Sequence, residues 1–179
     1  AQKIAELASV KHTILPINTF SSLGGNALTD HIDINNTTTN KDNQLPNTFV
    51  PGRNLIFLTF AAALAYRDGI ENLVTGVAQT DYSGYPDCRF DTLRALEKTL
   101  CLGMEYKIKI HTPLMHLSKA ETVELAIKLG AMEAMSYTHT CYNGVQPPCG
   151  HCPACILRAK GFSEAGVVDP LIGKDYSYK

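Results

Sequence analysis

The segment CYNGVQPPCGHCPAC, residues 141–155, holds four of the six cysteines of the chain. Its cysteines, Cys141, Cys149, Cys152 and Cys155, have the spacing C-x7-C-x2-C-x2-C. Four thiolates at such spacings are typical ligands of a tetrahedral zinc ion. Because four protein sulfurs leave no open coordination position, the pattern predicts one structural zinc, bound within a C-terminal zinc-binding subregion over residues 136–165.

Turn-forming residues separate these cysteines. Gly150 lies between two closely spaced ligands, and Gly144 lets the longer first loop fold back to bring Cys141 to the others. Two other interpretations stay open, namely unrelated reduced thiols or a redox-active disulfide pair. His139 or His151 could also replace one of the sulfurs.

Composition limits the classes of protein to consider. The chain has 179 residues, of which 45% are hydrophobic, and a formal net charge of -1. This length fits one domain with a proper core, and the charge gives no reason to expect a nucleic acid or a membrane as partner. Clustered thiols without a secretory signal favour a cytoplasmic location. Because the chain begins at Ala1 rather than at a methionine, we expect an N-terminal portion to be missing.

Hydrophobic periodicity predicts alternating helices and strands, which is typical of an α/β fold with a mainly parallel sheet. The helix over 55–66 is apolar nearly all round, so we expect it to be buried. The polar stretch 20–44 lacks periodicity and is interpreted as a mobile loop, either a lid or a variable insertion. The predicted helices are 1–9, 55–66, 90–102, 118–130 and 154–165, and the predicted strands are 12–17, 71–78 and 106–111.

The loop QTDYSGYPDCR, residues 79–89, follows the predicted strand 71–78. In open α/β sheets, ligands bind outside the carboxyl ends of the strands, so this loop is the expected binding site. Its polar side chains support that position. They are Asp81, Ser83, Asp87 and Arg89.

Side chains of this loop suit a guanine-like base that carries an anionic group. Asp87 could accept hydrogen bonds from the base edge, and Tyr82 or Tyr85 could stack on the ring. Arg89 could bind an anion in bidentate fashion. Cys88 has no adjacent base and is not expected to be a nucleophile. The alternative is a solvated loop with ordinary salt bridges.

Two further cations lie at predicted helix starts. Arg53 follows Gly52 in the segment 47–54 and could bind an anion there, although a surface charge beside a turn is the alternative. Lys119 follows Ser118 at a predicted capping box, where a cation opposes the helix dipole. A phosphate would explain that lysine, and a surface lysine is the alternative.

Several motifs resemble the 7-cyano-7-deazaguanine (preQ0) synthase family of the queuosine pathway, over about residues 45 to 165. The resemblance implies a Rossmann-like PP-loop fold, of the adenine nucleotide alpha hydrolase type, with helices on both faces of a mainly parallel sheet. It also implies one zinc per chain, bound by the four cysteines. The motifs are NTFVPGRN at 47–54, TGVAQTDYSGYPDCR at 75–89, TPLM at 112–115, KAET at 119–122, and CYNG with CGHCPAC within 141–155.

The resemblance further implies a ligase that converts 7-carboxy-7-deazaguanine and ammonia to the nitrile, with ATP and Mg²⁺, and that acts as a homodimer without nucleic acid or membrane. ATP would activate the carboxylate, ammonia would form the amide, and a second activation would allow dehydration. Asp87, Tyr85, Arg89 and Arg53 are the expected substrate contacts, and Lys119 is the expected phosphate contact. No general acid or base is identified.

One departure concerns the phosphate-binding loop. The family carries S-G-G-x-D-S near its N-terminus, and the pair Gly24-Gly25 does not fit that pattern. We therefore expect a single α/β domain over 1–179 that lacks its N-terminal ATP-loop unit. Two alternatives stay open. One is a PP-loop enzyme that thiolates or amidates tRNA, and the other is a zinc-binding interaction module.

Overall fold

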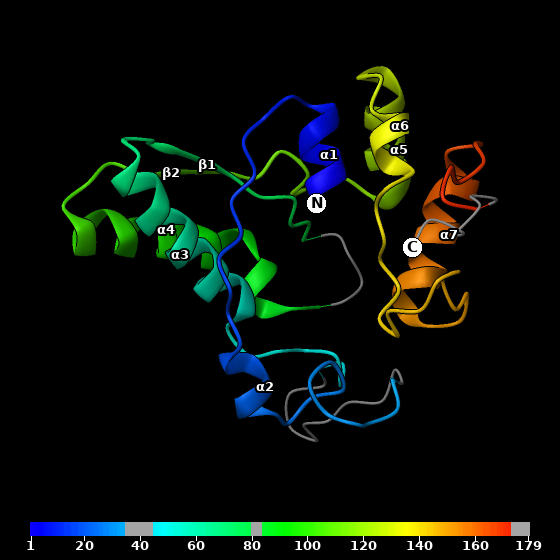
Figure 1. The fold of residues 1–179 in the computed structure, drawn as a ribbon, viewed down its shortest axis with the longest axis horizontal. Coiled ribbons are helices and arrows are strands. Elements are labelled where there is room, and N and C mark those ends of the chain that lie inside the picture. The colour runs from blue at the N-terminus through cyan, green and yellow to red at the C-terminus, as the bar shows by residue number, and fades with distance from the viewer. Residues whose placement is uncertain (35–44, 80–83, 173–179) are drawn as a thin grey trace. The chain divides into compact units, whose positions relative to one another are not determined.

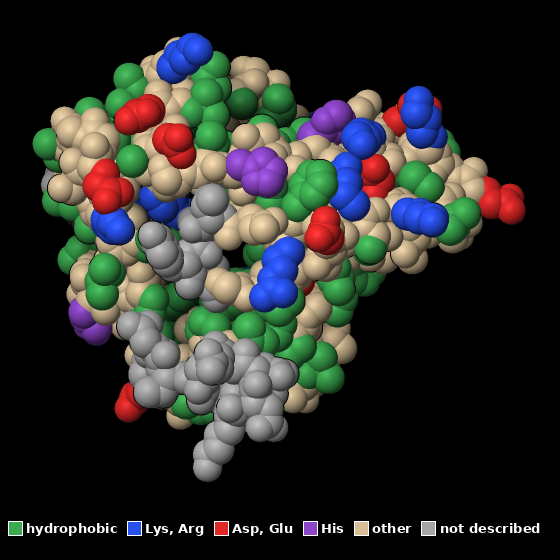
Figure 2. Space-filling model, turned by 180° about the vertical axis from the view of Figure 1, so that it is seen from behind, with side chains coloured by type: hydrophobic (Ala, Val, Ile, Leu, Met, Phe, Trp, Pro, Cys, Tyr) green, Lys and Arg blue, Asp and Glu red, His purple; other side chains and the backbone are tan. Residues whose placement is uncertain are grey.

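A computed structural model describes residues 1–34, 45–79 and 84–172 (Figure 1). These residues form two compact units. One unit combines the described N-terminal residues with Ser118 and the residues after it, and the other covers the described residues from 45 to Leu117. Within the described residues, no helix is long and apolar enough to cross a membrane. On the face drawn in Figure 2, basic and acidic side chains are interspersed.

The unit that ends at Leu117 is built around a parallel strand pair. β1 and β2 run parallel, with Leu73 opposite Ile110, and α4 connects them. This arrangement confirms an α/β fold with a parallel sheet, although both strands are shorter than predicted. The elements in chain order are α3 (Arg53–Arg67), β1 (Asn72–Val74), the 3-10 helix η1 (Pro86–Cys88), α4 (Phe90–Met104) and β2 (Lys109–His111).

The core of this unit lies between the two long helices and the strands. α3 presents Leu58, Ala62 and Ala65 from one face, at the i, i+4, i+7 spacing of a helix. The prediction that this helix is buried all round is wrong, because Phe57 and Phe60 on other faces are 45% and 48% exposed. The remaining buried members of the core are Leu93, Leu100, Ile108, Ile110 and Met115.

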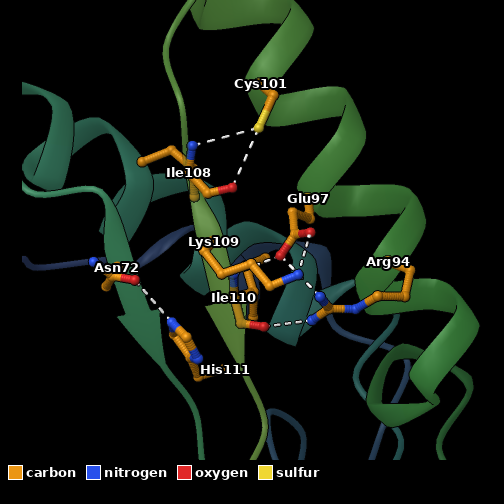
Figure 3. A network of polar contacts seen from close by, with 8 residues as sticks. All are labelled: Asn72, Arg94, Glu97, Cys101, Ile108, Lys109, Ile110 and His111. Carbon is orange, nitrogen blue, oxygen red and sulfur yellow. Dashed lines mark hydrogen bonds and ion pairs between the residues drawn. The ribbon is translucent and has the colours of Figure 1, made fainter.

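Side chains of α4 satisfy the outer edge of β2 (Figure 3). The backbone N–H of Ile110 donates to the Glu97 carboxylate at 2.6 Å, and the Ile110 carbonyl accepts from Arg94. Cys101 Sγ similarly lies 3.2 Å from the carbonyl of Ile108. Because unpaired backbone groups at a sheet edge need partners, these contacts hold α4 against β2 and close that edge.

Glycines with positive φ follow two helices. Gly69 follows α3 with φ 69°, and Gly130 follows α5 (Lys119–Lys128) with φ 67°. The predicted end of the helix at residue 102 is wrong, because α4 continues through Gly103 to Met104 and is followed by Glu105 in the left-handed region, at φ 47°.

The other unit consists of helices and connecting segments. A capping box opens α5, where Glu121 N–H donates to Ser118 Oγ at 3.2 Å and Ser118 N–H donates to the Glu121 carboxylate at 2.7 Å. α5 packs closely on α7, because a Cβ at Gly161 would lie 2.7 Å from the Cβ of Lys119. The elements are α1 (Gln2–Leu7), α2 (Thr19–Leu23), α5 (Lys119–Lys128), α6 (Met132–Met135) and α7 (Pro153–Glu164).

The N-terminal segment departs from the prediction at one place. Residues 11–18 form neither helix nor strand, so the predicted strand 12–17 is wrong. Ile14 within it is 70% exposed, which shows that its apolar residues do not face a core here. A strand requires a neighbouring strand for its backbone hydrogen bonds. In the predicted loop 20–44, α2 occupies the start, and residues 35–44 lie outside the described part of the chain.

Candidate metal centre and substrate loop

The four predicted cysteine ligands converge on one point. Their sulfur atoms all lie within 4.8 Å of one another. Cys152 is the N-cap of α7 and Cys155 lies in its first turn, so the helix start places two ligands, and the preceding loop places Cys141 and Cys149. Three of the four are buried, and Cys149 is half-buried.

The sulfur geometry fits a tetrahedral metal ion. Zn–S bonds of about 2.3 Å place tetrahedral sulfurs about 3.8 Å apart. Cys149 Sγ and Cys155 Sγ are separated by 3.9 Å, and all six cysteines of the chain are free thiols. Soft sulfur donors at these distances suit Zn²⁺ better than hard, oxygen-preferring cations. The four residues can therefore bind a zinc ion without a large rearrangement.

Backbone N–H groups point at the sulfur atoms. Cys152 N–H donates to Cys149 Sγ at 3.3 Å, Tyr142 N–H donates to Cys152 Sγ at 3.4 Å, and Cys149 N–H donates to Cys141 Sγ at 3.5 Å. Hydrogen bonds to a sulfur favour its thiolate form. The loop backbone is thus arranged for negative charge on the sulfurs, which is the form that binds a metal.

The pKa values of Cys149 and Cys155 are shifted in opposite directions. Burial opposes ionisation of Cys149, but the backbone N–H groups of His151 and Cys152 and the neighbouring thiols outweigh it and lower its pKa to about 6. Burial, together with the sulfurs of Cys152 and Cys141, raises the pKa of Cys155 to about 12, against the opposing N–H of Gly150. Neighbouring thiolates repel each other, and a bound dication would offset that repulsion.

The two nearby histidines bond to loop carbonyls. His139 Nε2 lies 3.0 Å from the carbonyl oxygen of Val145, and His151 Nδ1 lies 2.8 Å from that of Cys149. Within the described residues, the ligand group contains the four cysteines and neither histidine. This arrangement favours four sulfur ligands over the alternative with one histidine.

Two segments that the sequence predicts to bind the substrate lie far apart in the chain but contact each other in the structure. They are residues 47–54 and the end of the loop 79–89. Thr48 Oγ1 lies 2.5 Å from the hydroxyl of Tyr85, 37 positions away. The ring of Phe49 packs at 5.6 Å from that of Tyr85, and the Arg53 guanidinium lies 5.9 Å from the Tyr85 ring centre. Tyr85 is only 7% exposed, so it serves as a buried contact between the two segments.

Asp87 caps the N-terminus of α3. Its Oδ2 accepts from the backbone N–H of Asn54 at 2.9 Å, and the carboxylate is 5% exposed. Gly52, the N-cap residue, has φ 72° and offers no side chain for this purpose. The Asn54 amide also donates to Cys88 Sγ at 3.3 Å. The loop after β1 therefore supplies the cap that α3 lacks in its own sequence.

The remaining predicted residues lie in three places. Arg89 is the exposed N-cap residue of α4, beside the Gln79 side chain, whose Oε1 accepts from Phe90 N–H at 3.0 Å. Lys119 is the half-buried first residue of α5, in the other compact unit. Asp81, Tyr82 and Ser83 lie outside the described residues.

Sequence reasoning missed several residues that hold this loop, among them Thr48 and Asn54. Both lie within the motif NTFVPGRN, but their partners are Tyr85 and Asp87, which no local pattern connects to them. The small polar residues of that motif are a signal in the sequence that could have pointed to them.

Comparison with known proteins shows extensive similarity. The model of the family described as the queuosine biosynthesis protein QueC matches residues 1–166. A 7-cyano-7-deazaguanine synthase of Chromobacterium violaceum is 65% identical over 172 residues, which cover 96% of this chain and 74% of the relative. The synthase of Laribacter hongkongensis is 63% identical, with 97% and 76% covered. That of Bacillus subtilis is 50% identical, with 92% and 74% covered.

Proposed function

The chain belongs to the family of the queuosine biosynthesis protein QueC, and we infer that it catalyses formation of 7-cyano-7-deazaguanine from 7-carboxy-7-deazaguanine. The observation that carries this function is the high identity, over nearly the whole chain, to relatives that are named for that product. The contacts between the two predicted substrate segments support it, because the Arg53 guanidinium lies near the buried Tyr85 ring and the Asp87 carboxylate bonds to the start of α3.

The proposed chemistry removes both oxygens of one carboxylate. A carboxylate is a poor electrophile, so ATP adenylates it and pyrophosphate leaves. Ammonia then attacks the carbonyl carbon, AMP leaves and the amide forms. Adenylation of the amide oxygen by a second ATP, with loss of another pyrophosphate, allows the second AMP and the remaining amide proton to leave as the nitrile forms. Such a reaction depends on the alignment of the two substrates and on compensation of phosphate charge.

Residues of the unit that ends at Leu117 are proposed to bind the deazaguanine. Asp87 commits Oδ2 to α3, while Oδ1 has a long contact of 3.9 Å with Cys88 Sγ. We propose that Oδ1 accepts from the N1–H and the exocyclic amine of the base. Arg53 and Arg89 are the proposed contacts for the substrate carboxylate, because guanidinium groups bind carboxylates in bidentate fashion. Tyr85 orients Arg53 from its buried position.

We propose that the start of α5 contacts the nucleotide. Lys119 is the first residue of that helix, where N–H groups and a cation together favour phosphate. Mg²⁺ would accompany ATP, as is usual for phosphoryl and nucleotidyl groups. We propose a cytoplasmic enzyme, because its four clustered thiols require a reducing compartment. We also propose a homodimer, on the basis of the family resemblance.

Zinc is the metal proposed for the four cysteines. Cys141, Cys149, Cys152 and Cys155 would hold it, and its role when bound is to cross-link the loop to the start of α7. With four sulfurs bound, the ion keeps no open position for substrate. We therefore assign it a structural role.

The test is a product assay with the intact, zinc-loaded protein. It is incubated with 7-carboxy-7-deazaguanine, ATP and ammonium, and the nitrile is followed by mass spectrometry. Nitrile that forms only when ATP is present supports the proposal. Absence of nitrile from folded, zinc-loaded protein would contradict it and would favour a relative with another substrate. A parallel incubation with tRNA and a sulfur donor would identify thiolation.

A further inference from the structure

Arg158 forms a buried ion pair that the sequence motifs do not include. Its Nε donates to Asp169 Oδ2 at 2.5 Å and its Nη2 donates to Asp169 Oδ1 at 2.7 Å, so the pair is bidentate. The side chains are only 9% and 5% exposed. The guanidinium also packs at 5.1 Å from the ring centre of Phe162, and Leu171 N–H donates to Asp169 Oδ1 at 2.9 Å.

The same guanidinium also reaches the segment that leads to the first cysteine ligand. Arg158 Nη1 donates to Thr138 Oγ1 at 2.7 Å, and Nη2 donates to the carbonyl of Met135 at 3.3 Å. Thr138 lies three positions before Cys141, and Arg158 lies three positions after Cys155 on α7. One side chain thus connects the two arms of the chain that deliver the sulfur ligands.

We propose that Arg158 is a positioning residue for the metal centre and that Asp169 holds it in place. The inference rests on the zinc site proposed above. Without the guanidinium, the arm before Cys141 would lose its hydrogen bonds from α7 at Thr138 and Met135. The ligands would then be less well preorganised, and the metal would dissociate faster.

General stabilisation alone explains this arrangement poorly. Taking two charges out of water is costly, and a buried ion pair is often no more stabilising than apolar residues of the same size. A planar group with five fixed donors instead sets geometry, since it bonds to a carboxylate, a hydroxyl and a carbonyl in defined directions. Partners that orient metal ligands from outside typically change metal affinity by about 10- to 100-fold.

The experiment measures release of Zn²⁺ from the full chain to a chelating dye, with Co²⁺ absorption as a second readout of four-sulfur coordination. We expect Arg158→Met and Asp169→Asn to release Zn²⁺ about tenfold faster than the unaltered chain. Arg158→Lys should not rescue retention, because an ammonium lacks the planar fork. The matched control is Lys160→Met on the same helix, since Lys160 is half exposed and pairs with Glu164 at 3.7 Å.

Two further variants separate positioning from folding. Thr138→Val removes the contact with the arm before Cys141 and preserves the ion pair, so it should accelerate Zn²⁺ release while circular dichroism stays unchanged. Arg158→Met/Asp169→Leu replaces the pair by apolar groups and should fold, yet still release Zn²⁺ faster.

Unaltered release from Thr138→Val and from the double variant would overturn the positioning role, even if Arg158→Met were unstable. If the unaltered chain itself failed to retain Zn²⁺, the metal site proposed above would be refuted together with this inference.

Discussion

The Asp87 carboxylate accepts a hydrogen bond of 2.9 Å from the backbone N–H of Asn54, although 33 positions separate the two residues. The loop after β1 thereby fixes the start of α3, where Arg53 lies. This structural role and the proposed substrate-binding role belong to the same carboxylate. Substitutions can separate the two, because folding needs an acceptor for one N–H while the proposed base contact also needs negative charge.

Asp87→Asn should therefore reduce stability less than Asp87→Ala. The asparagine oxygen can still accept from Asn54, whereas alanine leaves a half-buried N–H without its cap, which costs about 1–2 kcal/mol. Both substitutions should raise KM for 7-carboxy-7-deazaguanine at least tenfold. Urea unfolding and steady-state kinetics measure the two effects. The exposed Asp91 of α4 provides the control Asp91→Asn, and an unchanged KM in Asp87→Asn would reject the base-reading role.

Thr48→Val and Tyr85→Phe should show coupled effects on stability. Each removes the same buried contact of 2.5 Å, and a buried hydrogen bond is worth about 0.5–1.5 kcal/mol. The double variant should then lose less than the sum of the two single losses, as measured by denaturant unfolding. Strict additivity would show that the two hydroxyls do not depend on each other.

Glu97→Gln should destabilise the protein near neutral pH and have little effect in acid. Burial opposes ionisation of Glu97, but the N–H of Ile110, with Lys109 and Arg94, outweighs it and lowers the pKa below the usual 4.5. A folded-state pKa below the unfolded value stabilises the fold above the unfolded value, and this contribution is lost as pH falls through the folded value.

The measurement compares the free energy of unfolding of Glu97→Gln with that of the unaltered protein at several pH values. We expect a deficit of about 1–2 kcal/mol at neutral pH, since a charge-assisted acceptor is lost, and a deficit that shrinks below pH 4.5. Glu164→Gln, at an exposed pair on α7, should show no such trend. A deficit that grows in acid would have the wrong sign for this account.

Gly161→Ala and Gly103→Ala should have opposite effects. A Cβ at Gly161 would lie 2.7 Å from Lys119 Cβ and 3.2 Å from its backbone carbon, so α5 and α7 would be forced apart at a cost of about 1–3 kcal/mol. Gly103 is also within a helix but has nothing within 4 Å of such an atom, and alanine there should stabilise by about 0.5–1 kcal/mol. Thermal unfolding measures both, and equal destabilisation would contradict the packing argument.

Local patterns predicted the features that depend on neighbouring residues. The structure brings the four predicted cysteines together, and it confirms the capping box at Ser118 and the parallel sheet. Each arises from residues close in sequence or from the alternation of helix and strand.

Features that depend on distant partners could not be predicted in the same way. The pairs Asp87 with Asn54 and Arg158 with Asp169 join separate segments, so no spacing reveals them. The wrong strand at 12–17 and the exposed Phe57 have the same origin, because an apolar residue is buried only where another element covers it. Sequence patterns indicate which residues are apolar, but they do not show whether another element packs against those residues.

The most direct test of the proposed reaction follows the two carboxylate oxygens. The intact, zinc-loaded protein is given 7-carboxy-7-deazaguanine labelled with ¹⁸O at both carboxylate positions, together with ATP and ammonium, and the products are analysed by mass spectrometry. The account predicts unlabelled nitrile and one ¹⁸O in each of two AMP molecules per turnover. Label in inorganic phosphate or water, or labelled amide that never becomes nitrile, would contradict it.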